Sequence, residues 1–81
     1  MKFKIEFKPR AAKDLRLINA DDGRRILAKV RAMENDLAGD VKRLTDFEPQ
    51  YRLRVGNYRV LFSVENDNII IYRIKHRREA Y

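Results

Sequence analysis

The sequence contains no cysteine and no tryptophan, and it has a single histidine, His76. Without cysteine the chain has no disulfide bonds, thiolate metal sites or thiol nucleophiles. One histidine is too few for a histidine-based metal cluster. We therefore expect neither a metal site nor a cofactor.

Long apolar runs are also missing. No stretch of the sequence approaches the roughly 18 apolar residues that a membrane-spanning helix requires. The first residues lack the pattern of a secretory signal. We therefore expect a cytoplasmic protein that does not bind membranes.

Acidic residues are outnumbered by basic ones, with 12 Asp+Glu against 19 Lys+Arg and a net charge of +7 over 81 residues. This length allows one domain with one core, covering residues 1–81. Hydrophobic residues make up 44% of the chain in periodic patterns, which argues against disorder. The basic balance favours an anionic partner, either nucleic acid or an acidic protein.

The first half of the chain predicts a strand followed by two helices. Residues 2–7 alternate apolar and charged side chains, which is typical of a half-buried strand. Pro9 suits the first position of a short helix over residues 9–18. These two elements are followed by a polar break at residues 19–23.

A second helix is predicted from an apolar stripe at helical spacing, made of Ile26, Val30, Met33 and Leu37. Asp21 or Asp22 is expected to cap its beginning by accepting a hydrogen bond from a free backbone N–H group. Gly39 is expected to end it. The two helices are expected to form an antiparallel hairpin.

The second half predicts strands. Gly56-Asn57 is a two-residue turn signal between alternating segments at 51–55 and 58–64. A polar turn at 65–68 then leads to a third strand at 69–75.

Residues 40–49 are less regular, and their apolar side chains Val41 and Leu44 form either a short edge strand or a plug for the core. The fold class is therefore α+β, in the order β-α-α-β-β-β with the extra edge strand left open. An N-terminal strand and a two-helix hairpin pack on a curved antiparallel sheet, with the helices on one face.

The turn at Gly56-Asn57 places Arg54 directly opposite Arg59, with Arg52 on the same side of the sheet. Like charges in that position destabilise a sheet by up to about 1 kcal/mol. No acidic residue lies on that face of the two strands. The cluster is either a solvated basic surface or a site that a phosphate-bearing ligand neutralises.

The third strand is expected to place Tyr72 and Ile74 on the arginine face, with His76 and Arg77 at its rim. Tyr72 or Tyr81 is then available to stack on a nucleic-acid base. The spacing by itself is compatible with RNA or DNA, and with catalysis or binding.

Residues 51–62 resemble the central hairpin of the RelE/ParE toxins of bacterial and archaeal toxin–antitoxin modules, and residues 74–81 resemble their closing motif. Residues 9–15 and 41–44 match as well. The resemblance implies a compact toxin that an antitoxin neutralises in a hetero-oligomer. RelE-like members cleave mRNA in the ribosomal A site without metal, whereas ParE-like members poison DNA gyrase.

The resemblance also implies site residues. Arg52 and Arg54 occupy places where RelE-type enzymes have basic residues, often lysines. Arg59 matches the phosphate-binding arginine, Arg77 the arginine of the closing motif, and Tyr81 the terminal tyrosine. The implied chemistry is attack of the ribose 2′-hydroxyl on the adjacent phosphate, with Arg59 and Arg52 stabilising charge and Arg77 at the leaving oxygen.

The chain departs from the RelE pattern at the general base, because position 54 is arginine. An arginine keeps its proton at every relevant pH, so Arg54 is a poor base. Either Arg54 acts only electrostatically, or His76 or Tyr81 is the base, or the nuclease is weak. We expect a metal-independent mRNA endoribonuclease; the alternatives are a ParE-like gyrase inhibitor and an inactive basic homologue that binds RNA or its antitoxin.

Overall fold

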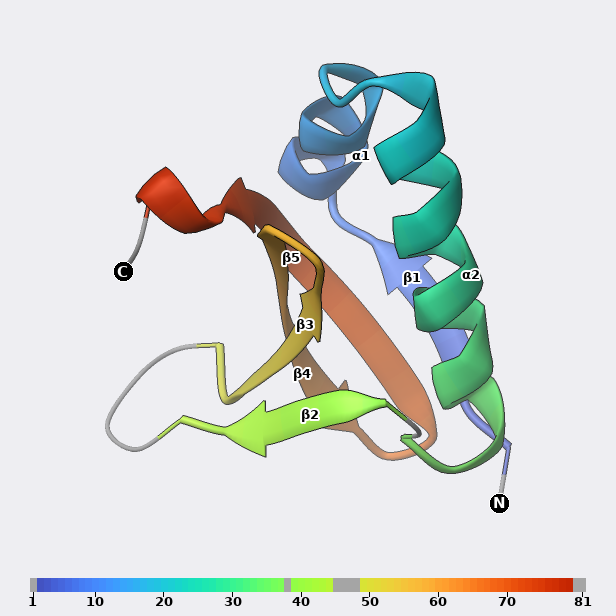
Figure 1. Ribbon diagram of the computed structural model, residues 1–81. Coiled ribbons are helices and arrows are strands. Elements are labelled where there is room, and N and C mark those ends of the chain that lie inside the picture. Colours follow the sequence, from blue (N-terminus) through green and yellow to red (C-terminus); the bar gives the residue numbers. More distant parts are fainter. Residues whose placement is uncertain (1, 38, 45–48, 80–81) are drawn as a thin grey trace.

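The computed structural model describes residues 2–37, 39–44 and 49–79. In chain order its elements are β1 (Lys4–Phe7), α1 (Pro9–Arg16), α2 (Ala20–Asp36), β2 (Asp40–Arg43), β3 (Tyr51–Val55), β4 (Tyr58–Glu65), β5 (Asn68–His76) and the 3-10 helix η1 (Arg77–Glu79). The strands form one curved sheet in the order β1-β5-β4-β3-β2, and both helices lie on one side of it (Figure 1). The predicted α+β fold is confirmed.

The sheet is antiparallel from β2 to β5, as the hairpin pattern predicts. At the other edge, β1 runs parallel to β5, with Ile5 beside Ile69. The expectation of a fully antiparallel sheet is therefore wrong at this edge. The expected edge strand is present as β2, whose residue Val41 also packs against the core, while Leu44 follows the strand.

The core lies between the helices and the inner face of the sheet, which is the face that the helices cover (Figure 1). In the predicted stripe Ile26, Val30 and Met33 are fully buried, and Leu37, the C-cap residue, is partly buried. They meet buried side chains from three strands: Leu53, Val60, Phe62, Ile69, Ile71 and Ile74. Burying one such side chain stabilises the fold by about 1.5–3 kcal/mol relative to leaving it exposed. This packing fixes which side of each strand is left for function.

The start of α2 differs from the sequence prediction. Asn19 is the N-cap residue, and its Oδ1 accepts a hydrogen bond of 2.9 Å from the backbone N–H of Asp22. Asp21 and Asp22 lie inside the first turn instead, where their negative charge favours the helix dipole. The helix therefore begins earlier than the aspartates suggest.

The end of α2 also differs. The helix stops at Asp36, and Leu37 adopts a left-handed conformation with φ of 50°. Gly39 comes later, with φ of 111°, where an added Cβ would lie 3.1 Å from Cδ1 of Leu53. Gly39 thus lets the segment between α2 and β2 pass close to Leu53 in the core, and it does not end the helix.

Strand β5 contains a bulge that reverses the expected faces of its second half. Opposite β4, Leu61 pairs with Arg73 and Phe62 pairs with Ile71, so Tyr72 is an extra residue without a partner. Because of this residue, Ile74 faces the helices and is buried. Its expected place on the arginine face is therefore wrong.

No helix in the described ranges is long and apolar enough to cross a membrane.

Candidate functional site

The outer face of the sheet, which points away from the helices, carries a line of charged residues across four strands. From β2 to β5 the successive cross-strand partners are Asp40, Arg54, Arg59 and Lys75. Side chains directly opposite each other on adjacent strands have Cβ atoms about 4.5–5.5 Å apart. Arg54, Arg59 and Lys75 therefore form one continuous positive line, which we call the cation row.

Within the cation row the side chains differ in exposure. Arg54 is exposed, whereas Arg59 and Lys75 are partly buried. In the part of the chain that the structure describes, the Lys75 ammonium makes no hydrogen bond or ion pair. The expected opposition of Arg54 and Arg59 is confirmed, and Lys75 extends it by one strand.

The next level along the strands consists of the cross-strand partners Lys42, Arg52, Leu61 and Arg73. Both arginines of this level are held by carboxylates within the molecule. Nη1 of Arg52 donates to the backbone carbonyl oxygen of Asp40 at 2.9 Å and to its Oδ1 at 3.3 Å. The Arg52 side chain is only 14% exposed. Over residues 51–55 and 58–64 the hairpin carries no acidic residue on this face, as expected, but the neighbouring strand β2 supplies Asp40. Arg52 thus holds the edge strand in place.

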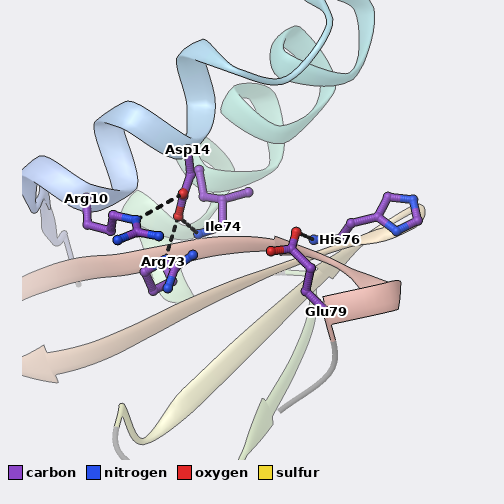
Figure 2. A network of polar contacts seen from close by, with 6 residues as sticks. All are labelled: Arg10, Asp14, Arg73, Ile74, His76 and Glu79. Carbon is purple, nitrogen blue, oxygen red and sulfur yellow. Dashed lines mark hydrogen bonds and ion pairs between the residues drawn. The ribbon is translucent and has the colours of Figure 1, made fainter.

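The Arg73 side chain reaches past the edge of β5 toward α1, at a point of β5 that lies beyond the end of β1. Its Nε donates to Oδ2 of Asp14 at 2.8 Å, and the same oxygen accepts from the backbone N–H of Ile74 at 3.0 Å (Figure 2). Nε of Arg10 lies 3.6 Å from the other carboxylate oxygen. Burial acts to raise the pKa of Asp14, but these donors outweigh it and hold the pKa below its ordinary value. Asp14 thereby fastens α1 to β5.

Arg77 lies beside the end of the cation row. Its backbone N–H donates to the carbonyl oxygen of Asn57 at 2.7 Å, so the chain continues along the hairpin turn that connects β3 and β4. Arg77 is the exposed first residue of η1 and follows Lys75 by two positions. The backbone of Arg77 therefore lies beside the turn that joins the strands of Arg54 and Arg59.

His76 lies on the other side of the sheet from Arg54 and Arg59, in a pocket that it lines together with Arg10 and Arg73. It pairs with Tyr58 in the sheet register, and the two rings meet edge to face with centroids 5.2 Å apart. The backbone N–H of His76 donates to Oε1 of Glu79 at 3.3 Å (Figure 2). Nδ1 of His76 accepts from the backbone N–H of Arg78 at 3.1 Å. The expected place of His76 at the rim of the arginine face is wrong, because the bulge turns it to the helix side. There it fastens η1 to β5.

Of the two tyrosines that are expected to stack on a base, the structure describes only Tyr72. Tyr72, the bulge residue, lines a cavity of about 220 Å³ together with Gln50, Ser63, Val64 and Glu65. This cavity lies toward the turn between β4 and β5, whereas the cation row lies near the opposite end of β4. Tyr81 lies outside the described residues.

Two site features escaped the sequence prediction. Lys75 is not among the predicted site residues, because regular alternation along β5 turns it toward the helices and no local pattern marks the bulge at Tyr72. Asp14 and its partner Arg73 are 59 residues apart in sequence, so only the packing of α1 on β5 reveals the pair. Within the described ranges, no three potential metal ligands gather in one place.

Comparison with known proteins identifies relatives over almost the whole length. The family model described as the ParE toxin of the type II toxin–antitoxin system parDE matches residues 5–81. Toxin RelE3 of Methanocaldococcus jannaschii is 34% identical over 83 residues, an alignment that covers 96% of this chain and 94% of the relative.

Solved structures agree with this result. A chain of the RelB–RelE antitoxin–toxin complex from Methanococcus jannaschii is 32% identical, with a TM-score of 0.78 and coverage of 93% of each chain. A chain of the archaeal RelE–RelB complex from Pyrococcus horikoshii gives a TM-score of 0.81 at 27% identity, covering 99% of this chain and all of that one. The chain therefore belongs to the RelE/ParE family and is a toxin of a type II toxin–antitoxin system.

Proposed function

We propose that this toxin is a metal-independent endoribonuclease that cleaves mRNA on the ribosome. The observation that carries the proposal is the cation row, with Arg77 beside it. Arg54, Arg59 and Lys75 place three positive charges on adjacent strands, while the neighbouring carboxylate of Asp40 is engaged by Arg52. A polyanion on this face would relieve the repulsion between them, and guanidinium groups match phosphate geometry.

The reaction is attack of a ribose 2′-hydroxyl on the adjacent phosphate. The bond from the 2′-oxygen to phosphorus forms and the bond from phosphorus to the 5′-oxygen breaks, giving a 2′,3′-cyclic phosphate and a free 5′-hydroxyl. The proton of the 2′-hydroxyl passes to water, and the leaving 5′-oxygen takes a proton from a protonated group at the site. The cation row stabilises the negative charge that grows on the phosphate oxygens, a contribution that is usually the largest single term in such catalysis.

A cognate antitoxin is the proposed protein partner. The relatives from Methanococcus jannaschii and Pyrococcus horikoshii were solved as complexes of RelE with RelB. We expect this chain to form a similar hetero-oligomer in which the antitoxin blocks activity. Binding to the folded toxin alone would raise its melting temperature by mass action, and no change on adding the cognate antitoxin would contradict the pairing.

The test of cleavage is to express the toxin in growing cells and map the 5′ ends of translated messages. We expect new ends with 5′-hydroxyl groups for the wild type, and about 10²–10³-fold slower cleavage for Arg59→Ala and Arg54→Gln. Arg31→Gln is the matched control, since it removes one positive charge from the exposed surface of α2. Intact messages in wild-type cells, or equal losses in all three variants, would overturn the proposal.

Inhibition of DNA gyrase is the second candidate function. It is favoured by the family model, whose description is the ParE toxin, and by Arg54, which cannot serve as a general base. DNA breaks that depend on gyrase, together with intact transcripts, would support this candidate over RNA cleavage.

A further inference from the structure

Lys75 differs chemically from the other members of the cation row. An unperturbed lysine ammonium has a pKa of about 10.4, whereas that of a guanidinium exceeds about 12. An ammonium therefore gives up a proton far more readily than an arginine does. Lys75 is the lysine of the cation row, and it lies one strand from Arg59, whereas Lys42 lies at the next level on the edge strand β2.

The position of Lys75 is set by its pairing in the sheet and by the bulge in β5. It lies directly opposite Arg59 on the neighbouring strand, so both side chains reach the same space above the sheet. Its side chain is partly buried, and its ammonium has no hydrogen bond or ion pair inside the described chain. The bulge at Tyr72 creates this placement, because without the extra residue Lys75 would turn toward the helices.

We propose that Lys75 is the proton donor to the leaving 5′-oxygen in the cleavage reaction. The inference rests on the proposed function and assigns a role within it. As the bond from phosphorus to the 5′-oxygen breaks, a proton passes from Nζ of Lys75 to that oxygen and leaves a neutral amine. The amine regains its proton from water before the next turnover. Arg59, directly opposite, holds the phosphate, and Arg77 adds positive charge at the same end of the sheet.

The first test compares two substitutions of Lys75 on ribosomes programmed with a short message, under single-turnover conditions. Lys75→Arg keeps the charge but donates a proton poorly, and Lys75→Met keeps the apolar stem without the charge. We expect cleavage to slow about 10²–10⁴-fold in Lys75→Met and at least 10-fold in Lys75→Arg. Full activity in Lys75→Arg would overturn the proton-transfer role.

The second test replaces the 5′-oxygen at the cleaved linkage with sulfur. A thiolate leaves without needing a proton, so the sulfur substrate should restore Lys75→Met and Lys75→Arg to within a few-fold of the wild type. Arg54→Gln is the control, because its loss is electrostatic and should persist on the sulfur substrate. No recovery of the Lys75 variants would contradict the proposal.

Failure of the proposed function is distinguishable from failure of this inference. A wild type that cleaves neither substrate overturns the endoribonuclease function and the role of Lys75 with it. A wild type that cleaves both substrates, with Lys75 variants that behave like Arg54→Gln, overturns the role of Lys75 alone. Melting temperatures near that of the wild type exclude unfolding as the cause of any loss.

Discussion

Arg54 and Arg59 lie directly opposite each other on β3 and β4, a cross-strand pair of like charge near the hairpin turn that joins these strands. Such a pair destabilises a sheet by up to about 1 kcal/mol. Asp40 lies across from Arg54 on the other side and offsets part of this repulsion. The fold thus tolerates the pair, and the proposed function gives it the role of binding an anion.

Removing one member of the pair should separate stability from activity. In Arg54→Gln the repulsion by Arg59 and the attraction by Asp40 are lost together. We therefore expect the free energy of unfolding to change by less than about 0.5 kcal/mol, while RNA cleavage falls sharply. Urea denaturation checks the first expectation. A loss above 2 kcal/mol would show that Arg54 is structural.

Arg52 should behave in the opposite way, because its guanidinium is held by Asp40 and its side chain is mostly buried. We expect Arg52→Gln to lower the free energy of unfolding by about 1–2 kcal/mol. Backbone amides of β2 should exchange hydrogen faster, since the contact joins that strand to β3. Asp40→Asn is the partner variant, and the two losses should be less than additive. Additive losses would argue against a direct interaction.

Asp14 should make stability depend on pH. Because its pKa is lowered in the folded state, its carboxylate stabilises the fold above the unfolded-state pKa, and this contribution is lost as pH falls through the folded-state value. We expect Asp14→Asn to lower the free energy of unfolding by about 1–3 kcal/mol at pH 7. The difference from the wild type should shrink below about pH 4.

The matched control for this experiment is Asp21→Asn, since the Asp21 side chain is 85% exposed where it pairs with Arg24. Exposed pairs of this kind contribute about 0–1 kcal/mol, so little change is expected. Denaturation of the three proteins between pH 2 and pH 7 measures the effect. A gap between wild type and Asp14→Asn that stays constant across this range would contradict the assignment.

Asn19 should carry the N-terminal cap of α2. Asn19→Ala removes the acceptor for the Asp22 backbone N–H, and we expect a loss of about 1 kcal/mol. Asn19→Ser keeps a capping oxygen and should retain most of the stability. Thermal unfolding compares the two. Equal losses in both variants would show that the cap does not depend on the side-chain oxygen.

Local signals determined a large part of the fold. The turn at Gly56-Asn57 sets the register of β3 and β4, and the predicted pairing of Arg54 with Arg59 is confirmed. The apolar stripe of α2 correctly predicts which of its faces is buried. These features follow from residues close together in sequence, where spacing and turn chemistry decide the geometry.

Tertiary packing decided the composition of the site. One unpaired residue, Tyr72, moves Ile74 into the core and Lys75 onto the outer face, because burying isoleucine outweighs regular alternation. The acids that occupy Arg52 and Arg73 come from other elements, β2 and α1. The sequence by itself determined that basic residues gather on one face of a hairpin. Only the packing of distant segments decided which of them are engaged within the fold, since those contacts have no local pattern.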